Sequence, residues 1–309
     1  MFRSRRKKLI FEIIFILIIF LWILKSFSSF DEINLSTICL KLNKQPKSKI
    51  DSNLILISEL NLFYCNVPKA ASTNLRRLII SYLNSNKSFQ TINRKQVWFD
   101  YEKFFSKYYF NQSSPEILRN LPDHIFKFVL VRHPFRRILS VYNDKFLNNH
   151  LEDTLSGWIQ LEENILLEMK TNETLISIRR NEIRLDFQTF LLYIIDSIQR
   201  KNQINSHWER IVQRCFICSI NYNWIGKIEN FDEDSKILIE KLNNHINRIN
   251  LEFPSKNLDR NLNKSISLTD YQLFQYFRSI IRDDEKFRIL IDYYRPDLQI
   301  FKYLFPKYI

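Results

Sequence analysis

The sequence of 309 residues contains only two glycines, Gly157 and Gly226. Glycine-rich phosphate-binding loops need several glycines within a few residues, so a Walker A loop and a dinucleotide-binding fingerprint are both excluded. Collagen-like chains and glycine-serine linkers are excluded for the same reason. The four cysteines are too few for a miniprotein held together by disulfides, although they permit one or two bridges.

The chain does contain enough apolar surface for a folded core. Hydrophobic residues make up 45% of it and aromatic residues 15%, which argues against wholesale disorder, and the length suits one large domain or two small ones. The formal net charge of +13 has two explanations. It reflects either a codon bias that also enriches Ile, Asn and Phe, or a positive field for a polyanion such as nucleic acid, anionic lipid or acidic polysaccharide.

An apolar run near the N-terminus predicts a membrane anchor. Residues 9–24 are apolar except for Glu12, and extension to residue 30 gives enough length to span a bilayer. Basic residues are concentrated before the run, which places the N-terminus in the cytosol. We expect a cytosolic tail over residues 1–8 and an uncleaved signal anchor, a transmembrane helix, over residues 9–30. A cleaved signal peptide is the alternative, although no A-x-A-like site follows.

This topology makes the remainder luminal or extracellular, in a single-pass type II membrane protein. Five N-x-S/T sequons, which glycosylation of a secreted glycoprotein would use, support it weakly because an Asn-rich chain produces such triplets by chance. A nucleic-acid partner is disfavoured. We expect a polar stem over residues 31–58 and one luminal domain over residues 59–309. The sequons follow the anchor at Asn34, Asn86, Asn111, Asn172 and Asn263.

A strand, a tight loop and a helix come first in that domain. Residues 60–67 (LNLFYCNV) predict a buried strand, Pro68 ends it, and residues 73–83 predict an amphipathic helix. Ser72 or Thr73 is expected to cap the helix. The N–H groups at such a helix start bind anions.

The loop itself suits an anionic ligand. Ala70, Ala71 and Ser72 are small enough to let the backbone approach a ligand, and Lys69 adds a positive charge. Taken alone, the segment equally fits an ordinary strand-to-helix turn with a surface lysine.

A second strand-to-helix unit follows about sixty residues later. Residues 125–131 (IFKFVLV) predict a strand, and Arg132 lies at its carboxyl end, where open α/β sheets bind ligands. Ser140 lies about two helical turns further on and returns to the same side of the element. Together the two side chains suit a terminal phosphate. Arg136 and Arg137 are expected to be exposed helix charges.

Three segments resemble one known family, the Golgi carbohydrate sulfotransferases (sulfotransferase family 2), which include the chondroitin, dermatan and HNK-1 sulfotransferases. CNVPKAASTNLRR resembles their 5′-phosphosulfate loop, and VRHPFRRILSVYNDKF resembles their 3′-phosphate motif. The stretch from His207 to Asp234 resembles the family's HW…CxxC…YxxIGKxE block. The segments occur in the family's order, and the resemblance covers roughly residues 60–242.

The resemblance implies an α/β, P-loop-like sulfotransferase fold with a central parallel sheet flanked by helices. It also implies the donor 3′-phosphoadenosine 5′-phosphosulfate as co-substrate, a Golgi membrane location and an acidic or neutral glycan as acceptor. Arg132 and Ser140 are then expected to bind the 3′-phosphate. Residues expected at the 5′-phosphosulfate are Lys69, Ser72, Thr73 and Asn74, with the backbone of Pro68, Ala70 and Ala71 close by.

Two positions depart from the family. Leu75 stands where many relatives carry Trp, and Ala71 stands where Gly is common. The first change is expected to affect packing only. The second narrows the space through which the loop backbone approaches the donor.

Sulfuryl transfer needs in-line geometry, charge stabilisation and deprotonation of the attacking hydroxyl. Lys69 and the helix start meet the second need by stabilising the leaving phosphate. No metal is required, and no ligand cluster for one is evident. For the base, His207 is the preferred residue, with a structural role as the alternative. Glu229 is the second choice, although a structural ion pair with Lys227 or a nearby arginine explains it better.

The cysteines are expected to serve structure. Cys215 and Cys218 form a CxxC pair without the further ligands of a zinc site, so a disulfide with an unassigned partner is preferred. Cys65, within the first strand, is expected to be a buried thiol.

The rival enzyme is a luminal glycosyltransferase that uses a DxD motif with a divalent metal. Residues 232–234 match that motif formally, but acidic residues at the start of a probable helix explain them better. A catalytically inactive membrane protein that binds acidic glycans is the non-enzymatic alternative. For a sulfotransferase, the expected acceptor is a chondroitin- or dermatan-type glycosaminoglycan or a glycan containing N-acetylgalactosamine.

Overall fold

The computed structural model describes residues 35–42, 53–83, 92–98, 100–110, 114–147, 156–169, 184–246 and 268–304. Within these ranges, none of the helices has both the length and the apolar character needed to cross a bilayer. The tail, the anchor and all five sequons lie outside the described residues.

A four-stranded sheet forms the centre of the fold, in the order β1-β2-β3-β4. The three strands β2, β3 and β4 run parallel, and β1 pairs antiparallel with β2. The expected α/β fold with a mostly parallel sheet is thus confirmed. The strands are β1 (Leu54–Ile57), β2 (Leu62–Cys65), β3 (Phe126–Val131) and β4 (Trp224–Lys227).

The first strand changes the expected boundary of the domain. β1 lies within residues 31–58, which we expected to form a stem, and its register pairs Leu54 with Cys65. A short helix, α2 (Leu35–Leu42), also lies in that stretch. The folded region therefore begins before Glu59, because the antiparallel partner of β2 comes from the residues just upstream of it.

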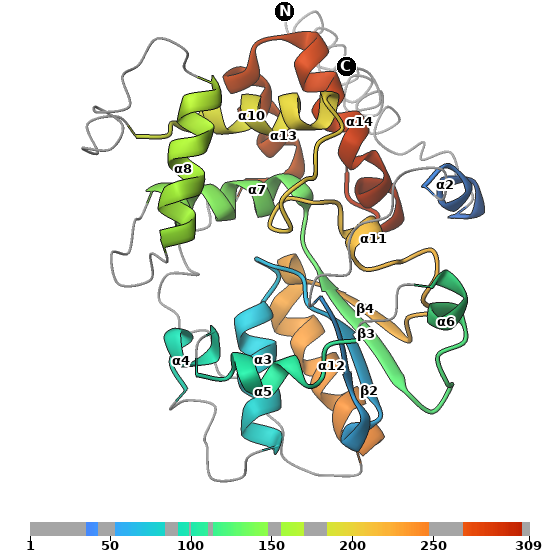
Figure 1. Cartoon of the computed structure of the whole chain (residues 1–309). Helices are drawn as coiled ribbons and strands as arrows, with labels where there is room; N and C mark the ends of the chain where they lie inside the picture. The colour runs from blue at the N-terminus through green and yellow to red at the C-terminus, as the bar shows by residue number, and fades with distance from the viewer. Residues whose placement is uncertain are drawn as a thin grey trace, which may run out of the picture.

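Both faces of the sheet are buried, as the apolar runs predict for parallel strands. In β3 the side chains of Phe128 and Leu130 join one hydrophobic cluster, whereas Val129 and Val131 join the other. This alternation follows from the two-residue period of a strand. The cluster that contains Phe128 and Leu130 lies under α3 (Ser72–Leu83) and α12 (Phe231–Ile246), which Figure 1 shows beside the sheet.

A group of helices gathers at the end of the sheet where β3 leads into α7 (Figure 1). Phe135, at the start of α7, is fully buried and stacks on Phe277 with ring centroids 4.5 Å apart. C-terminal residues beyond the stretch of resemblance (residues 60–242) therefore belong to the core. The group comprises α7 (Pro134–Tyr142), α8 (Ser156–Met169), α10 (Phe187–Gln199), α11 (Ile211–Arg214), α13 (Asp270–Ile281) and α14 (Asp284–Ile300).

Shorter elements complete the described chain. A π-helical turn, η3, follows α7, and single 3₁₀ turns follow β1 and β4. Their bounds are α4 (Arg94–Trp98), α5 (Glu102–Ser106), α6 (Pro115–Arg119), η1 (Ser58–Leu60), η3 (Asn143–Leu147) and η4 (Ile228–Asn230).

Two disulfides join distant parts of the chain, Cys39–Cys218 and Cys65–Cys215. The prediction that the CxxC cysteines form disulfides is confirmed, each with its own partner. The prediction that Cys65 is a buried thiol is wrong, because α11 places Cys215 against the carboxyl end of β2. This bridge lies only a few residues before the loop that carries Lys69.

Candidate functional site

The loop between β2 and α3 adopts a backbone that glycine usually provides. Lys69 and Ala71 have φ angles of 67° and 57°, in the left-handed region that costs a non-glycine residue roughly 1–2 kcal/mol. The family resemblance led us to expect glycine at the position of Ala71, and glycine adopts a left-handed φ angle without steric cost. The methyl group of alanine is small enough for this chain to hold the same shape.

The helix after the loop begins at Ser72. The N–H of Leu75 donates to Ala71 O at 3.0 Å, so the N–H groups of Ser72, Thr73 and Asn74 belong to the first turn of the helix, which lacks intrahelical acceptors. We expected Ser72 or Thr73 to precede the helix as its cap, but both lie within its first turn. The arrangement is that of an anion-binding helix start.

Side chains in the first turn of α3 are held by hydrogen bonds from α4 and from α3 itself. The indole N–H of Trp98 donates to Thr73 Oγ1 at 3.1 Å, and Arg77 donates to Asn74 Oδ1 at 3.1 Å. Because an indole only donates, the Thr73 hydroxyl keeps its own hydrogen for an anion. The guanidinium carbon of Arg76 lies 4.1 Å from the centroid of the Trp98 ring. This cation–π contact helps to hold the indole in place.

The structure brings the two strand-to-helix motifs into contact. Arg132, at the carboxyl end of β3, donates from Nη1 to the carbonyl oxygen of Lys69 at 3.0 Å. Burial lowers the pKa of Arg132, and the nearby Glu229 carboxylate opposes that shift. Ser140 is partly buried on α7 further along the same motif. The two motifs thus meet at the carboxyl ends of the parallel strands β2 and β3.

A chain of contacts runs from Lys69 to His207. Lys69 Nζ lies 2.8 Å from Asp144 Oδ2, and Lys145 Nζ lies 3.4 Å from the same oxygen. Lys145 in turn lies 5.2 Å from the ring centroid of Trp158, whose ring meets that of His207 edge to face at 4.8 Å. The third sequence block therefore lies beside the donor loop.

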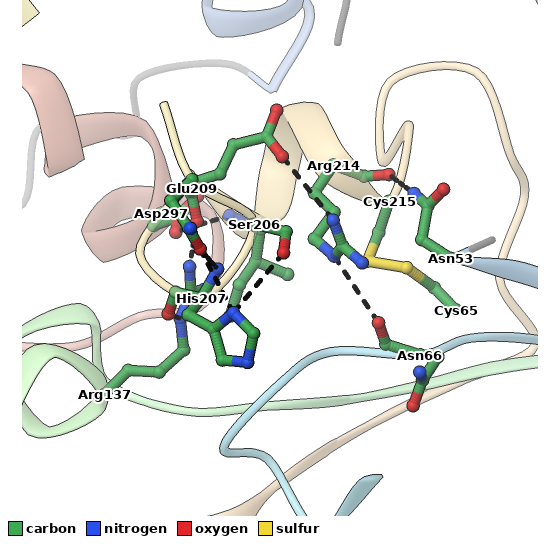
Figure 2. A network of polar contacts seen from close by, with 12 residues as sticks. Asn53, Cys65, Asn66, Arg137, Ser206, His207, Glu209, Arg214, Cys215 and Asp297 are labelled. Carbon is green, nitrogen blue, oxygen red and sulfur yellow. Dashed lines mark hydrogen bonds and ion pairs between the residues drawn. A yellow bond between two sulfur atoms is a disulfide. The ribbon is translucent and has the colours of Figure 1, made fainter. Parts of the chain in front are cut away.

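His207 is held in one tautomer. Asn205 Oδ1 accepts the backbone N–H of His207 at 2.9 Å and lies 3.1 Å from its Nδ1. An amide oxygen only accepts, so Nδ1 carries the hydrogen and Nε2 carries the lone pair. Figure 2 shows Nε2 pointing away from this network.

The electrostatic surroundings keep this imidazole neutral. Burial lowers the pKa of His207 to about 3, and the charges of Lys145 and Lys69 add to the shift. A neutral ring with Nε2 unprotonated is the form that accepts a proton from a hydroxyl.

The loop that carries His207 is fixed by buried side chains from α7 and α14. Arg137 donates from Nε to His207 O at 3.1 Å and from Nη2 to Glu209 O (Figure 2). Asp297 accepts the backbone N–H groups of Ile211 and Val212 at 2.8 and 2.9 Å. The carbonyls and N–H groups of the loop are thus satisfied from within the core.

The expectation that Arg137 is an exposed helix charge is wrong, because its side chain is 0% exposed. Arg136 is partly buried and pairs with Asp270 at 3.2 Å. Both arginines therefore connect α7 to other elements instead of facing solvent.

Glu229, the second choice for the base, uses both carboxylate oxygens in hydrogen bonds. Oε1 accepts the backbone N–H of His133 at 2.8 Å, and Oε2 accepts the hydroxyl of Tyr303 at 3.0 Å. These bonds tie η4 to the start of α7 and to the C-terminal segment. Glu229 is thereby explained as a structural residue, although its bonds are to an amide and a phenol instead of a cation.

The acidic triplet at residues 232–234 occupies the first turn of α12, as expected for residues that favour a helix start. Asp234 also accepts the backbone N–H of Lys227. Within the described ranges, the His, Cys, Asp and Glu side chains form no group of three or more that could hold a metal ion.

Four residues of this site were not found from the sequence: Trp98, Arg137, Asp144 and Asn205. Asp144 lies four residues after Ser140 in the same motif, and Asn205 lies two residues before His207. Their closeness in sequence to Ser140 and His207 was the feature from which Asp144 and Asn205 could have been found. Trp98 and Arg137 act through contacts between distant segments, for which the sequence gives no signal.

Comparison with known proteins agrees with this arrangement. A family model described as "Sulfotransferase family" matches residues 52–304. Carbohydrate sulfotransferase 11 of Rattus norvegicus is 28% identical over 267 residues, which cover 83% of this chain and 68% of that protein. Carbohydrate sulfotransferase 9 of Homo sapiens is 26% identical over 250 residues, covering 79% of this chain and 52% of that protein.

Carbohydrate sulfotransferase 12 of Mus musculus is 25% identical over 209 residues, covering 62% of this chain and 48% of that protein. No solved structure matches the chain significantly. The family match extends from just before β1 to the end of the described C-terminal residues. On this evidence the chain belongs to the sulfotransferase family.

Proposed function

We propose that the protein transfers the sulfuryl group of 3′-phosphoadenosine 5′-phosphosulfate to a hydroxyl group of a carbohydrate. The observation that carries the proposal is the contact between Arg132 and the Lys69 carbonyl, which joins the two donor motifs at one edge of the sheet. The family match supports sulfuryl transfer, and the names of the relatives support a carbohydrate acceptor.

We propose the following part for each residue in the reaction. The acceptor oxygen attacks the sulfur as the bond between sulfur and the 5′-phosphate oxygen breaks, and the electron pair leaves on that phosphate. Lys69 and the first N–H groups of α3 stabilise the charge that develops there. His207 Nε2 takes the proton of the acceptor hydroxyl, with Asn205 holding the ring in the tautomer required. No metal has a part in these steps.

For the acceptor, we propose a chondroitin- or dermatan-type glycosaminoglycan or a glycan that contains N-acetylgalactosamine. The net charge of +13 supports an acidic polymer, because a positive field concentrates polyanions. Lys145, beside His207 and Lys69, adds a cation where the acceptor has to approach.

We also propose that the protein is a single-pass type II protein of the Golgi membrane. The apolar residues 9–30, the preceding basic residues and the downstream sequons support this topology. Protease treatment of sealed Golgi vesicles tests it: the folded region stays protected until detergent is added. Digestion without detergent contradicts the topology.

The function is tested by incubating the full-length protein in detergent with labelled donor and a panel of desulfated polysaccharides, followed by disaccharide analysis. We expect label in at least one polysaccharide and none with Lys69→Ala, which lacks the charge at the leaving phosphate. Asp292→Asn, an exposed change on α14, is the active control. Activity that survives a metal chelator separates the proposal from a metal-dependent glycosyltransferase. Failure to label any acceptor contradicts the proposal.

A further inference from the structure

Asp144 contacts the donor lysine from the helix that carries the other donor motif. It lies in η3, the π-helical turn that continues α7 beyond Ser140, and π-helical turns recur at functional sites. Its Oδ2 lies 2.8 Å from Lys69 Nζ, although the residues are 75 positions apart. This contact joins the 3′-phosphate helix to the 5′-phosphosulfate loop.

The pair is well shielded from solvent. The side chains of Lys69 and Asp144 are 16% and 15% exposed, so water and salt screen their attraction less than they screen a surface pair. Lys145 lies 3.4 Å from the same carboxylate oxygen, so one negative charge is shared by two positive ones. An anion that arrives at Lys69 therefore meets a carboxylate already in contact with that lysine.

We propose that Asp144 competes with the donor for Lys69. The carboxylate holds the ammonium group before the donor binds, yields it to the 5′-phosphosulfate, and takes it back as the nucleotide product leaves. The inference rests on the proposed function, because it takes Lys69 as a donor-binding residue. Asp144 is thus a positioning residue that opposes nucleotide binding and favours product release.

The test compares the binding of adenosine 3′,5′-bisphosphate to the full-length protein and to Asp144→Asn by calorimetry at fixed ionic strength. Asparagine keeps the size of the side chain and still accepts a hydrogen bond, but it carries no charge. We expect the dissociation constant to fall about fivefold to tenfold, where tenfold corresponds to about 1.4 kcal/mol. A misfolded variant cannot produce this result, because misfolding removes sites instead of tightening them.

Asp292→Asn is the matched control. It removes the same charge from an exposed side chain of α14 that pairs with Arg295, so any effect of net charge alone appears there too. We expect its dissociation constant to equal that of the unmodified protein.

An Asp144→Asn variant that binds the bisphosphate no more tightly than the unmodified protein would overturn the inference. If the turnover of that variant also fell more than about a hundredfold, Asp144 would be a proton acceptor instead of a competitor for Lys69. A protein that binds the nucleotide yet sulfates no glycan contradicts the proposed acceptor and leaves this comparison intact. Absence of nucleotide binding by the unmodified protein refutes the donor site itself.

Discussion

The two disulfides are nested, and their contributions to stability depend on one another in a way that mutation can measure. Cys65–Cys215 spans 150 positions, and Cys39–Cys218 spans 179. Cys39 precedes Cys65, and Cys218 follows Cys215, so the shorter loop lies within the longer one. Once one bridge has formed, the second closes a ring of only about 29 positions, which is the difference between the two spans. The relevant loop for removing either bridge alone is therefore the short one.

Chain entropy then sets the expected free energies of unfolding. With the logarithmic loop-closure relation, a ring of about 30 residues is worth about 3.6 kcal/mol and one of about 150 residues about 5 kcal/mol. Replacing either cysteine pair alone should thus cost about 3.6 kcal/mol. Replacing both pairs should cost about 9 kcal/mol, which exceeds the two single losses together by about 1.5 kcal/mol.

The assay is guanidinium unfolding of four proteins: the unmodified chain, Cys39→Ser with Cys218→Ser, Cys65→Ala with Cys215→Ala, and all four changes together. An osmolyte such as trimethylamine N-oxide keeps the last protein folded. Packing losses at the buried pair cancel in the cycle because they occur in two of the four proteins. Single losses that add up to the combined loss within about 0.5 kcal/mol would refute the nested-loop reasoning.

Three further predictions concern histidines and the arginine that holds one of them. His207→Ala should lower turnover by about 10²–10⁴-fold while the affinity for adenosine 3′,5′-bisphosphate stays nearly unchanged; near-normal turnover would remove His207 from the mechanism. Arg137→Met loses the hydrogen bonds to two loop carbonyls. This change should reduce turnover in the otherwise unmodified protein but have little further effect on turnover in the His207→Ala variant. An equal reduction of turnover in both proteins would show that the role of Arg137 is purely structural. His133 caps α7 through Nδ1, and burial lowers its pKa to about 3. As the pH falls, the imidazole of His133 is therefore protonated in the unfolded chain at a higher pH than in the folded protein. Below about pH 6.5, this group should lower the free energy of unfolding by about 1.4 kcal/mol per pH unit. His133→Asn, which can still cap the helix, should show a weaker pH dependence of the free energy of unfolding between pH 7 and 5. An unchanged pH dependence would contradict this prediction.

Local patterns were sufficient to predict the elements that carry the donor motifs. The apolar runs at residues 60–67 and 125–131 contain β2 and β3, and the amphipathic segment after the loop is α3. The position of Arg132 at the carboxyl end of β3 was predicted from the sequence, whereas its contact with Lys69 is known from the structure. These features depend on residues close in sequence or on a general property of sheets, and the resemblance to the sulfotransferases supplied the chemistry.

Features that depend on distant contacts were not predictable. The pairing of Cys65 with Cys215 requires α11 to lie against the end of β2, which neither segment encodes alone. Arg137 lies within an amphipathic helix, where a charge normally faces water. It is buried, and the carbonyls of His207 and Glu209 accept hydrogen bonds from its Nε and Nη2. The position of Asp144 depends on the π-helical turn η3. A π-helical turn adds one residue to a helical turn, and five residues are too few for that change of period to be recognised in the sequence.

The scarcity of glycine poses a physical problem that the fold answers. Lys69 and Ala71 hold left-handed backbone angles that cost each of them roughly 1–2 kcal/mol, so the loop persists only if its surroundings enforce it. The disulfide at Cys65 fixes the strand before the loop, and Arg132 fixes the carbonyl of Lys69 itself. A loop without glycine also loses less backbone entropy when it folds into this shape. Rigid neighbours thus offset the strain, and the loop is ordered before any donor arrives.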